Sequence, residues 1–546
     1  MKKKICSIFL ALATLISLAA CNGGTAEQSA APSEQSAGES SDPTASGDAQ
    51  VGESSFAAYL ASAQKDVINV GIEADVSDFN PWTYTGVGAN AAIWSLYQPL
   101  LNQVGDMYYP AIMKSYSIAD DGLSMDGEIF DYVYDWEGNH LTADDVLFSL
   151  EKSVEYYPEV GDQIEEVIKT GEYTFTIVFP RTLYVGEFDN IARSRIVSQA
   201  AYEGSADEMH TSPVGTGPYK LTQYTSGYMF TYEKLEDWWQ TDESQIHPRD
   251  MSNVDTINWY VISESAQRTI ALEQGTIDVC SSISADDQEK FDGQNGYWLT
   301  SVPDNLSMTL FPNCDVSSPC NDLNLRLAIC YAISNQAVLD SVYGGRGTVN
   351  TEFTPNWAVG INEEWAEEDN YYHLDMEKAA EYLAQSDYNG ETLTIICATD
   401  EKSTNTAQLI QNFILQIGIK SEVTSYESSV FNQYIKEADM WDIMLKTTAT
   451  STYYSQGVHS SFSQTRQAWG GSINFIYDDQ LQELIDTCMS PTHTTEDLEA
   501  LHRYFIDNCY VMGLVNPVIC SVVPDWISDV TLSIRKTIIP GGCIYE

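Results

Sequence analysis

The segment from residue 391 to residue 424 has the pattern of a β-strand, an α-helix and a second β-strand. Apolar residues dominate Glu391–Ala398, which predicts a strand, and Ile419–Thr424 is predicted to be a second strand. Between them, Thr404–Ile417 carries an apolar stripe at helical spacing and is followed by a helix stop at Gly418. Two strands joined by a helix of this length are expected to be parallel neighbours with a right-handed crossover. The pattern therefore predicts an α/β fold.

The composition limits the partners that the chain can have. At 546 residues it is long enough for two or three lobes with separate cores. Its 79 acidic residues outnumber the 26 Lys and Arg residues, which gives a formal net charge of −53. Such a charge argues against binding to nucleic acid or to an anionic membrane surface. No internal stretch has the length and apolar character of a transmembrane helix.

The N-terminus has the pattern of a bacterial lipoprotein signal peptide. Lys2–Lys4 precedes the mostly apolar stretch Ile5–Ala20, which ends in Leu-Ala-Ala before Cys21. We expect cleavage before Cys21 and lipid attachment to its thiol; the alternative is an ordinary secretory signal with an incidental cysteine. Loss of residues 1–20 removes three lysines and no acids, which takes the net charge from −53 to −56. Residues 21–65, rich in Ser, Ala, Gly and Glu, predict a disordered tether.

A turn with two prolines and two glycines, Ser212–Leu221, leads into two predicted antiparallel strands, Tyr219–Tyr224 and Tyr228–Leu235. Its sequence, Ser-Pro-Val-Gly-Thr-Gly-Pro-Tyr-Lys-Leu, resembles the signature turn of the extracellular solute-binding proteins of family 5, the peptide-binding lipoproteins of ABC importers. Other segments resemble motifs of that family in the same order along the chain. They are the strand Val67–Ile72 with the helix Ala89–Leu101, the helix start Leu141–Val146 with its capping residues Thr142 and Asp145, the segment Arg268–Asp278 with a helix stop at Gly275, and the helix Asp322–Ser334.

The resemblance implies a large type II periplasmic-binding-protein fold. This is an α/β architecture of two lobes with an extra accessory lobe, and it closes on a ligand by hinge motion. The expected segments are a signal peptide (1–20), a tether (21–65), lobe I in three parts (66–95, 206–305 and 496–546), the accessory lobe (96–205) and lobe II (306–495). In this arrangement the turn Ser212–Leu221 marks the return from the accessory lobe into lobe I.

Nine of the eleven cysteines lie beyond the predicted lipidation site, at positions 280, 314, 320, 330, 397, 488, 509, 520 and 543. An odd number cannot all pair within one chain, so at least one thiol is expected to stay free. Cys314 and Cys320 flank a Ser-Ser-Pro loop and are the best candidates for a disulfide. Cys330 and Cys397 lie within apolar patterns and are expected to be small core residues.

Motifs of serine and metal-dependent enzymes are absent or incomplete. Ser149–Lys152 fits Ser-x-x-Lys and Lys169–Gly171 fits Lys-Thr-Gly, both found in penicillin-interactive enzymes. The first lies inside a predicted helix, the second follows too closely, and no Ser-Asp-Asn separates them. No Cys and His residues have the spacing of a zinc site. We therefore expect no catalytic residue, no metal site and no cofactor, with a lipid-anchored secreted hydrolase as the alternative of another class.

Aromatic side chains in loops are the best candidates for ligand contact. The chain has 33 Tyr and 12 Trp residues, and most of them must belong to cores or ordinary surface. Some fall in loops where the family lines its cleft, and aromatic walls with a few polar groups suit ligand pockets. With the hydroxyl residues beside them, the candidate ligand-binding residues are Trp82, Tyr84, Trp357, Thr447, Thr448, Tyr453, Tyr454 and Trp469.

The segment after the predicted strand Trp441–Leu445 departs from the family pattern. Peptide-binding members usually continue with Gly-Trp and an Asp that pairs with the α-ammonium of the ligand. Here the strand is followed by Lys446–Tyr453, and no acid occurs between Asp442 and Asp478. The resemblance implies capture of oligopeptides outside the cell membrane and delivery to an ABC permease. The missing Asp makes an oligosaccharide the alternative ligand, and nickel or haem, which some relatives carry, is less favoured.

Overall fold

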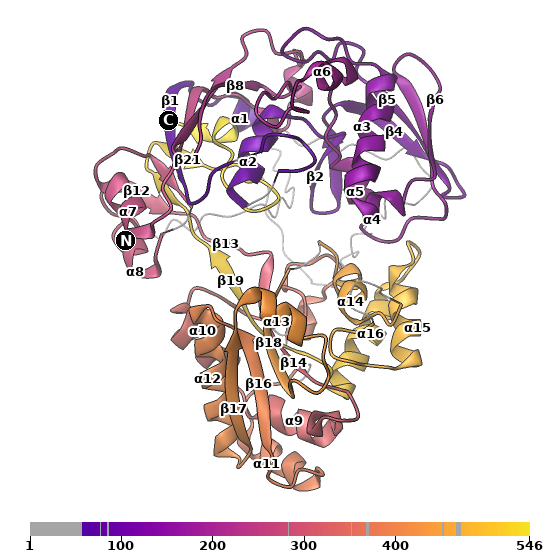
Figure 1. Ribbon diagram of the computed structural model, residues 1–546, viewed down its shortest axis with the longest axis vertical. Coiled ribbons are helices and arrows are strands. Elements are labelled where there is room, and N and C mark those ends of the chain that lie inside the picture. Colours follow the sequence, from indigo (N-terminus) through magenta and orange to yellow (C-terminus); the bar gives the residue numbers. More distant parts are fainter. Residues whose placement is uncertain are drawn as a thin grey trace, which may run out of the picture.

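The computed structural model describes residues 57–76, 78–84, 87–281, 283–350, 352–366, 371–449, 452–465 and 471–546. An upper and a lower body are joined by narrow connections (Figure 1). The expected signal peptide and Cys21 lie outside the described residues, as does almost all of the expected tether. Within the described part, no helix has the length and apolar character needed to cross a membrane.

Lobe I, in the upper body, is built on a sheet of seven strands. Strand β1 lies at its centre and pairs in parallel with β10 and β11, and the hairpin of β8 and β9 continues the sheet beyond β10. The strand order is β12 (Tyr297–Leu299), β20 (Val522–Pro524), β11 (Val279–Cys280), β1 (Lys65–Ile72), β10 (Val254–Val261), β9 (Met229–Lys234) and β8 (Tyr219–Thr225). This lobe also contains the helices α2 (Val87–Leu96), α7 (Ser265–Glu273) and α8 (Ala285–Gln288), the short helix α1 (Ala57–Leu60), and the strand pair β21 (Ile527–Asp529) and β22 (Ile544–Tyr545).

The accessory lobe forms the other half of the upper body (Figure 1). Its four-stranded antiparallel sheet has the order β4 (Met113–Ile118), β5 (Ser124–Ile129), β7 (Thr174–Val178) and β6 (Glu166–Lys169). Beside it lie the hairpin of β2 (Leu101–Val104) and β3 (Met107–Pro110) and the helices α3 (Ala143–Tyr156), α4 (Pro158–Gly161), α5 (Phe188–Ala192) and α6 (Gln199–Gly204). Its separate core supports an independent packing unit.

Lobe II contains a second sheet covered on both faces. Its order is β13 (Val302–Pro303), β19 (Met512–Ile519), β14 (Leu306–Pro312), β18 (Ile443–Ala449), β16 (Thr392–Ala398) and β17 (Lys420–Tyr426), with β15 (Gly347–Val349) paired to β19. Alternate residues point to opposite faces, so Leu310 joins one core and Phe311 the other. The first core contains residues of α9 (Leu323–Tyr331), α10 (Asn335–Tyr343), α11 (Met376–Gln385) and α12 (Glu401–Gln416). The second core is formed mainly with residues of α13 (Ser428–Tyr434), α14 (Tyr454–Phe462), α15 (Asp479–Met489) and α16 (Thr495–Asn508).

The strand–helix–strand prediction is confirmed. Strands β16 and β17 pair in parallel over their whole lengths, from Thr392 opposite Lys420 to Ala398 opposite Tyr426. Helix α12 begins at Glu401, earlier than expected, because the side chain of Asp400 accepts a hydrogen bond from the Ser403 amide and caps the helix there. The predicted capping box of α3 is also present, with Thr142 and Asp145 bonding each other's backbone.

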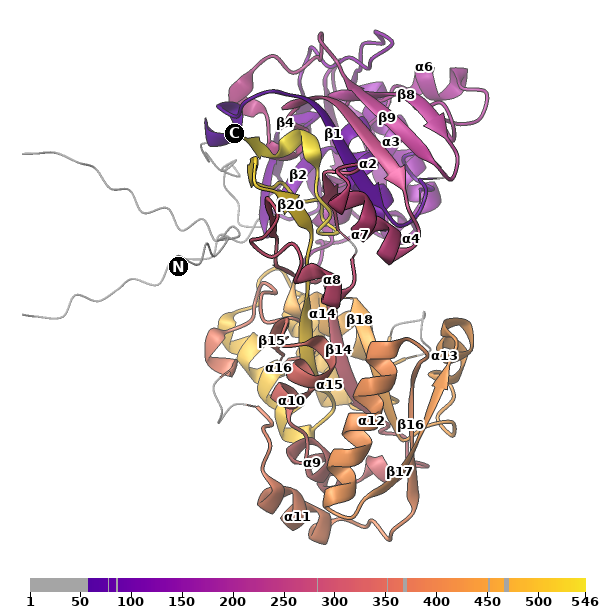
Figure 2. The same ribbon diagram turned by 90° about the vertical axis from the view of Figure 1, so that its left-hand side faces the viewer.

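Two adjacent connections join the lobes. The chain leaves lobe I between Leu299 and Val302 and returns between Ile519 and Val522. The two crossing segments are bonded to each other, because the Thr300 amide donates to the Ser521 carbonyl at 2.9 Å and the Ser521 amide donates to Thr300 Oγ1 at 2.9 Å. Figure 2 shows the lobes above and below this narrow junction. Its geometry suits a hinge.

The return into lobe I falls later in the chain than the expected boundary at residue 496. Helix α16 packs on α15, and β19 pairs with β14, so both elements belong to lobe II. The apolar residues Leu501 and Phe505 bury α16 in the second core of that lobe. Of residues 496–546, only those from β20 onward belong to lobe I.

The turn Ser212–Leu221 lies against the C-terminal end of α2. A Cβ atom at Gly215 would lie 2.0 Å from the Leu96 carbonyl oxygen, and one at Gly217 would lie 2.4 Å from that of Ser95. The Gly217 amide donates to the Leu96 carbonyl at 2.9 Å. These glycines therefore allow the two backbones to approach each other closely. Helix α2 ends at Leu96 instead of the predicted Leu101, shortly before Pro99, which has no amide hydrogen to donate to a helix.

The predicted disulfide between Cys314 and Cys320 is wrong. All nine cysteines in the described residues are free thiols. Cys320 is fully buried on a 3₁₀ turn in the first core of lobe II, whereas Cys314 borders the second core. The shortest sulfur–sulfur contact given by the structure is instead between Cys330 and Cys509, whose Sγ atoms lie 3.3 Å apart.

Candidate ligand-binding site

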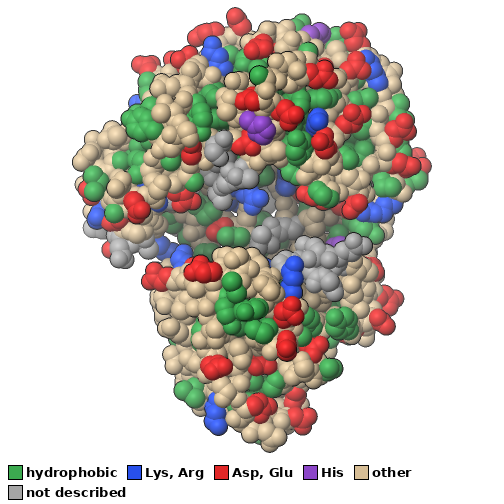
Figure 3. Space-filling view, viewed as in Figure 1, with side chains coloured by type: hydrophobic (Ala, Val, Ile, Leu, Met, Phe, Trp, Pro, Cys, Tyr) green, Lys and Arg blue, Asp and Glu red, His purple; other side chains and the backbone are tan. Residues whose placement is uncertain are grey.

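A cavity of about 570 Å³ lies in the upper body where lobe I meets the accessory lobe. Figure 3 shows the surface hollowed between the upper and lower bodies, with basic side chains visible at that level. The cavity is within the size range of small-molecule sites. Its aromatic lining residues are Trp82, Tyr84, Trp94 and Tyr157, and its charged lining residues are Glu159, Arg193, Arg195 and Arg535.

The loop after β1 positions Trp82 at the cavity. The Trp82 amide donates to Asn80 Oδ1 at 2.8 Å, which holds the tight turn of this loop. The indole Nε1 donates to Ser153 Oγ at 3.2 Å, and the ring stacks on Tyr156 with an interplanar angle of 8°. Tyr157 donates its hydroxyl hydrogen to the Trp82 carbonyl at 2.7 Å. Lobe I and the accessory lobe together fix this aromatic wall.

Arg195 is a buried basic residue of the cavity lining. Its side chain is only 5% exposed, and its guanidinium carbon lies 4.0 Å from the centre of the Trp94 ring. Arg195 Nη1 donates to the Tyr97 carbonyl at 3.1 Å, and Tyr84 is a further hydrogen-bond partner of the side chain. Burial lowers the pKa of Arg195. The guanidinium is thus oriented by a ring and by uncharged oxygen atoms.

Two further arginines line the same cavity. Arg193 Nη2 lies 3.4 Å from Asp189 Oδ2, whereas its buried Nε has no hydrogen-bond partner among the described residues. Burial raises the pKa of Asp189, which also accepts a hydrogen bond from Tyr108. Arg535 is exposed at the tip of the C-terminal turn and forms no ion pair within the described part of the chain. Both arginines therefore retain donor capacity towards the cavity.

Arg249 and Asp250 lie behind the cavity wall. The guanidinium carbon of Arg249 is 5.1 Å from the centre of the Trp94 ring, and its nitrogens donate to the carbonyls of Gln103 and Leu532. Burial lowers the pKa of Arg249 to about 10 and raises the pKa of Asp250 to about 6. Asp250 accepts a hydrogen bond from the Asn102 amide. Arg249 and Asp250 are thus further charged residues close to the cavity, although they do not line it.

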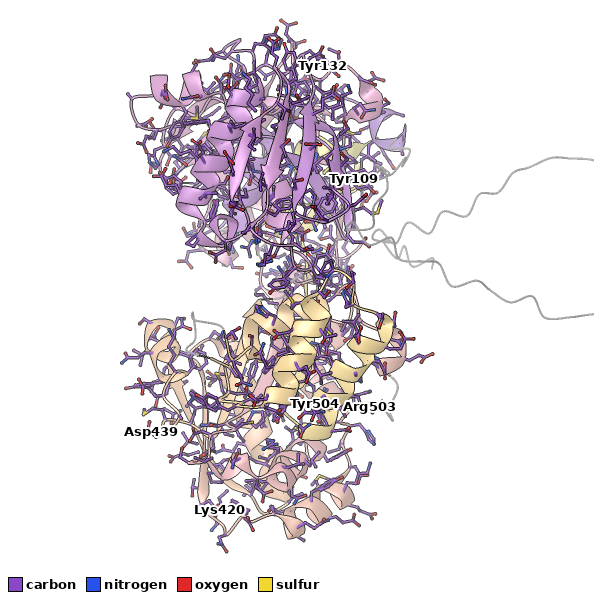
Figure 4. The ribbon with its side chains drawn as sticks, turned by 90° about the vertical axis from the view of Figure 1, so that its right-hand side faces the viewer. Tyr109, Tyr132, Lys420, Asp439, Arg503 and Tyr504 are labelled. Carbon is purple, nitrogen blue, oxygen red and sulfur yellow. The ribbon has the colours of Figure 1, made fainter. Side chains whose placement is uncertain are left out.

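The lobes also touch on either side of this region. Lys536 Nζ of lobe I lies 5.3 Å from the centre of the Trp357 ring in lobe II. In the accessory lobe, the Val185 amide donates to the Met489 carbonyl of lobe II at 3.2 Å. Figure 4 shows side chains of both bodies meeting at this level, with Tyr132 and Lys420 far from it. Because Arg535 adjoins Lys536, the rim of the cavity reaches the interlobe contact.

The structure places the predicted ligand-binding residues in different environments. Trp82 and Tyr84 line the cavity, and Trp357 lies at the interlobe contact. Thr447 is exposed on β18, whereas Thr448 is buried and donates to the Ser307 carbonyl. The remaining three residues do not share a setting: Tyr453 is buried and hydrogen-bonded to Tyr108 across the lobes, Tyr454 lies in the second core of lobe II, and Trp469 is outside the described residues.

The basic residues of the site were not predicted from the sequence. Arg193 and Arg195 are two residues apart in a chain with few cations, and Arg535 adjoins Lys536. That local density of positive charge was the available signal. Ser149 of the rejected Ser-x-x-Lys motif is buried in α3, where its Oγ accepts a hydrogen bond from the Val197 amide. No group of His, Cys, Asp and Glu side chains in the described ranges is arranged to hold a metal ion.

Two lobes joined by paired strands, with a cavity near their contact, define a bilobal solute-binding protein. Residues 107–469 match the bacterial extracellular solute-binding proteins, family 5 Middle, and the chain belongs to this family. It is similar to the dipeptide-binding protein of Escherichia coli K12, with 22% identity over 426 residues, 71% of this chain and 77% of the relative. It is also similar to the glutathione-binding protein GsiB of Salmonella typhi, with 23% identity over 387 residues, 69% of this chain and 72% of the relative.

Solved structures have the same fold. The ABC transporter substrate-binding protein CtaP of Listeria monocytogenes has a TM-score of 0.76 and 17% identity, with 88% of this chain and 99% of that chain covered. HbpA2 of Haemophilus parasuis has a TM-score of 0.77 and 18% identity, with 88% and 100% covered. The bilobal fold predicted from the sequence is therefore confirmed. Members of the family are solute-binding proteins.

Proposed function

We propose that this chain is the substrate-binding lipoprotein of an ABC importer that captures short peptides and delivers them to a membrane permease. The observation that carries the proposal is the cavity lined by aromatic side chains and by charged side chains of both signs, located beside the interlobe contact of a family 5 protein. Planar aromatic side chains pack against peptide groups and side chains, and lining groups of both charges suit the two termini of a short peptide.

Capture would be completed by closure about the Thr300–Ser521 junction. A ligand shifts the balance between open and closed forms only through contacts that differ between them. In the proposal, the peptide contacts Trp82 and Tyr84 from above, and the lobe II residues Trp357 and Thr447 approach it from below. The exposed position of Thr447 on β18 supports this assignment, and Trp357 is already 36% exposed at the lobe contact.

The amino terminus of the ligand requires an acid other than the one that the family usually supplies. No acid occurs between Asp442 and Asp478, but Glu159 lines the cavity from the accessory lobe. Its exposed carboxylate has no ion-pair partner within the described residues. We assign Glu159 the role of ammonium partner, and the Glu159→Gln variant should bind N-acetylated peptides as well as the wild type does.

Lipid attachment at Cys21 would hold the protein at the outer face of the cell membrane. The basic and apolar residues before Cys21 support this part of the proposal. In cells that export the full chain, Cys21→Ala should move the protein from the membrane fraction to the soluble fraction. Unchanged membrane association of the variant would refute lipid anchoring while leaving the peptide-binding proposal intact.

A thermal-shift screen of di-, tri- and tetrapeptides tests the ligand class. A peptide at one hundred times its Kd should add about 2.7 kcal/mol to the free energy of unfolding. Oligosaccharides of similar size serve as the comparison set, because the aromatic walls would also suit sugars. Stabilisation by a sugar and by no peptide would overturn the peptide assignment. Turnover of bound peptides or sugars at catalytic rates would overturn the binding-protein assignment.

A further inference from the structure

We propose that residues 184–189 of the accessory lobe form a latch for lobe II, and that a chain of hydrogen-bonded side chains couples this latch to the cavity. The hinge at Thr300 and Ser521 joins lobe I to lobe II, whereas the latch joins the accessory lobe to lobe II. The coupling rests on the proposed function, because closure on a ligand gives the latch its purpose. The latch itself is a property of the protein and can be measured without a ligand.

The latch touches the start of helix α14 and the end of helix α15 in lobe II. The Val185 amide donates to the Met489 carbonyl at 3.2 Å. A Cβ atom at Gly186 would lie 2.8 Å from Tyr453 Cδ2 and 2.7 Å from Gln456 Oε1. Gly186 also has a φ of 77°, which glycine adopts at little cost. Glycine at this position therefore lets the latch lie directly against lobe II.

Bonds within the accessory lobe hold the latch in shape. Arg181 makes two hydrogen bonds to the Glu187 carboxylate, from Nη1 to Oε2 at 2.7 Å and from Nη2 to Oε1 at 2.8 Å. Its guanidinium carbon lies 3.9 Å from the centre of the Tyr184 ring, and the Tyr184 amide donates to Glu187 Oε2 at 2.7 Å. None of these bonds involves lobe II, so the latch keeps its shape when the lobes separate. Little conformational freedom is then lost when the latch engages.

A chain of hydrogen bonds runs from lobe II to the cavity wall. Tyr453 of lobe II is hydrogen-bonded to Tyr108 of the accessory lobe, and both side chains are buried. The Tyr108 hydroxyl donates to the Asp189 carboxylate. Asp189 pairs in turn with Arg193, which caps the C-terminal end of α5 and lines the cavity. The latch and part of the cavity wall therefore belong to one continuous segment, residues 184–193.

Asp189 makes the two ends of this chain depend on each other. It is only 3% exposed, and burial raises its pKa, whereas the charge of Arg193 and the hydrogen bond from Tyr108 oppose that shift. A buried carboxylate is costly unless it is paired and hydrogen-bonded. Separation of the lobes breaks the bond between Tyr453 and Tyr108 and admits water to Asp189, which loosens its hold on Arg193. A change at Arg193, in the other direction, weakens the acceptor that Tyr108 uses.

Amide hydrogen exchange at Val185, measured by mass spectrometry at single-residue resolution, reports opening of the latch. Tyr453→Phe removes the interlobe hydroxyl and keeps the ring. Since one hydrogen bond changes an equilibrium by about 2- to 12-fold, exchange at Val185 should accelerate by that factor. The Tyr184 amide is bonded within the accessory lobe and should keep its rate. Tyr504→Phe is the matched control, because the Tyr504 hydroxyl donates to Asp478 within lobe II (Figure 4).

Gly186→Asn tests the close approach of the latch to lobe II. The new side chain would meet lobe II, and asparagine tolerates a positive φ better than most residues with a side chain. Mild overpacking corresponds to a factor of about 5 or more, and exchange at Val185 should accelerate by at least that much. Gly105→Asn is the control, because Gly105 also has a positive φ but a Cβ there meets nothing within 4 Å. Equal exchange at Val185 in these two variants would refute the latch.

Exchange at the same amide tests the coupling to the cavity. Arg193→Gln changes a cavity residue that is paired with Asp189, and it should accelerate exchange at Val185 by about 2- to 12-fold. Arg535→Gln changes a cavity residue outside the chain of bonds and should leave the rate unchanged. Equal rates in the two variants would refute the coupling.

Tripeptides, tri-alanine among them, separate the latch from the proposed function. A bound peptide should slow exchange at Val185 in the wild type, and a bound peptide that leaves this rate unchanged would refute the coupling. If none of the peptides binds while Tyr453→Phe accelerates exchange as expected, the latch stands and peptide capture is refuted. If peptides bind while Tyr453→Phe and Tyr504→Phe exchange alike at Val185, the latch is refuted and peptide capture stands.

Discussion

The guanidinium carbon of Arg195 lies 4.0 Å from the centre of the Trp94 ring, and that of Arg249 lies 5.1 Å from the same centre. Trp94 is fully buried, and its Nε1 has no hydrogen-bond partner in the described part of the chain. The indole ring therefore makes cation–π contacts with two buried guanidinium groups at the junction of lobe I and the accessory lobe. Cation–π contacts in desolvated settings contribute about 2 kcal/mol.

Replacement of Trp94 by alanine should destabilise the protein strongly. Removing a buried tryptophan lowers the free energy of unfolding by about 3–5 kcal/mol, and here Arg195 and Arg249 also lose the aromatic ring that they contact. Urea unfolding measures the loss. The matched control is Trp357→Ala, which removes a 36% exposed ring and should cost about 1 kcal/mol or less. Equal losses for the two variants would contradict the role of Trp94.

Replacement of Gly217 by alanine should disturb the junction between α2 and the turn Ser212–Leu221. The new Cβ would lie 2.4 Å from the Ser95 carbonyl oxygen, and backbone atoms cannot move aside cheaply. We expect a loss of about 1–3 kcal/mol or more, measured by thermal unfolding. Gly204→Ala is the control, because a Cβ there meets nothing within 4 Å. A Gly217→Ala variant as stable as this control would refute the close-approach explanation.

Asp250 should make stability fall as the pH rises from about 4 to about 6. Burial raises its pKa from 3.8 to about 6, so in that range the folded state holds a proton that the unfolded chain releases. The contribution is therefore fully present below pH 3.8 and is lost as the pH passes through 6, a change of about 2–3 kcal/mol. Between pH 4 and pH 7, the free energy of unfolding measured with urea should fall less for Asp250→Asn than for the wild type. The same fall in both proteins would exclude Asp250 as its source.

Cys330 and Cys509 should be the pair that an added oxidant links. Their Sγ atoms are 3.3 Å apart, whereas Cys314 and Cys320 border different cores. Diamide accepts two electrons and two protons, one from each thiol, as the sulfur–sulfur bond forms. Peptide mapping after diamide treatment and alkylation should therefore find Cys330 joined to Cys509. A link between Cys314 and Cys320 in its place would show that the sequence-based pairing was right.

The elements with strong local patterns were predictable. The strand–helix–strand pattern of residues 391–424 predicted the parallel pair β16 and β17, and Thr142 with Asp145 predicted the start of α3. Contacts between segments far apart in the sequence were not predictable. The Leu96 carbonyl at the end of α2, for example, accepts a hydrogen bond from the Gly217 amide, more than one hundred residues later.

The candidate site was predictable only in its aromatic part. Trp82 and Tyr84 stood out because they follow a strand in a polar loop, and both line the cavity. Arg195 and Arg535 come from segments far apart in the chain, and neither has a periodic pattern or motif around it. Only the fold brings them together, since the C-terminal turn returns to lobe I after the chain has crossed to lobe II and back.

The most direct test of peptide capture is titration of the folded protein with tripeptides, followed by mass spectrometry of the peptide recovered from the complex. We predict binding of one peptide per protein molecule, with the peptide released intact after prolonged incubation. Recovery of cleaved peptide, or no binding of any peptide under conditions in which the protein is folded, would contradict the proposed function.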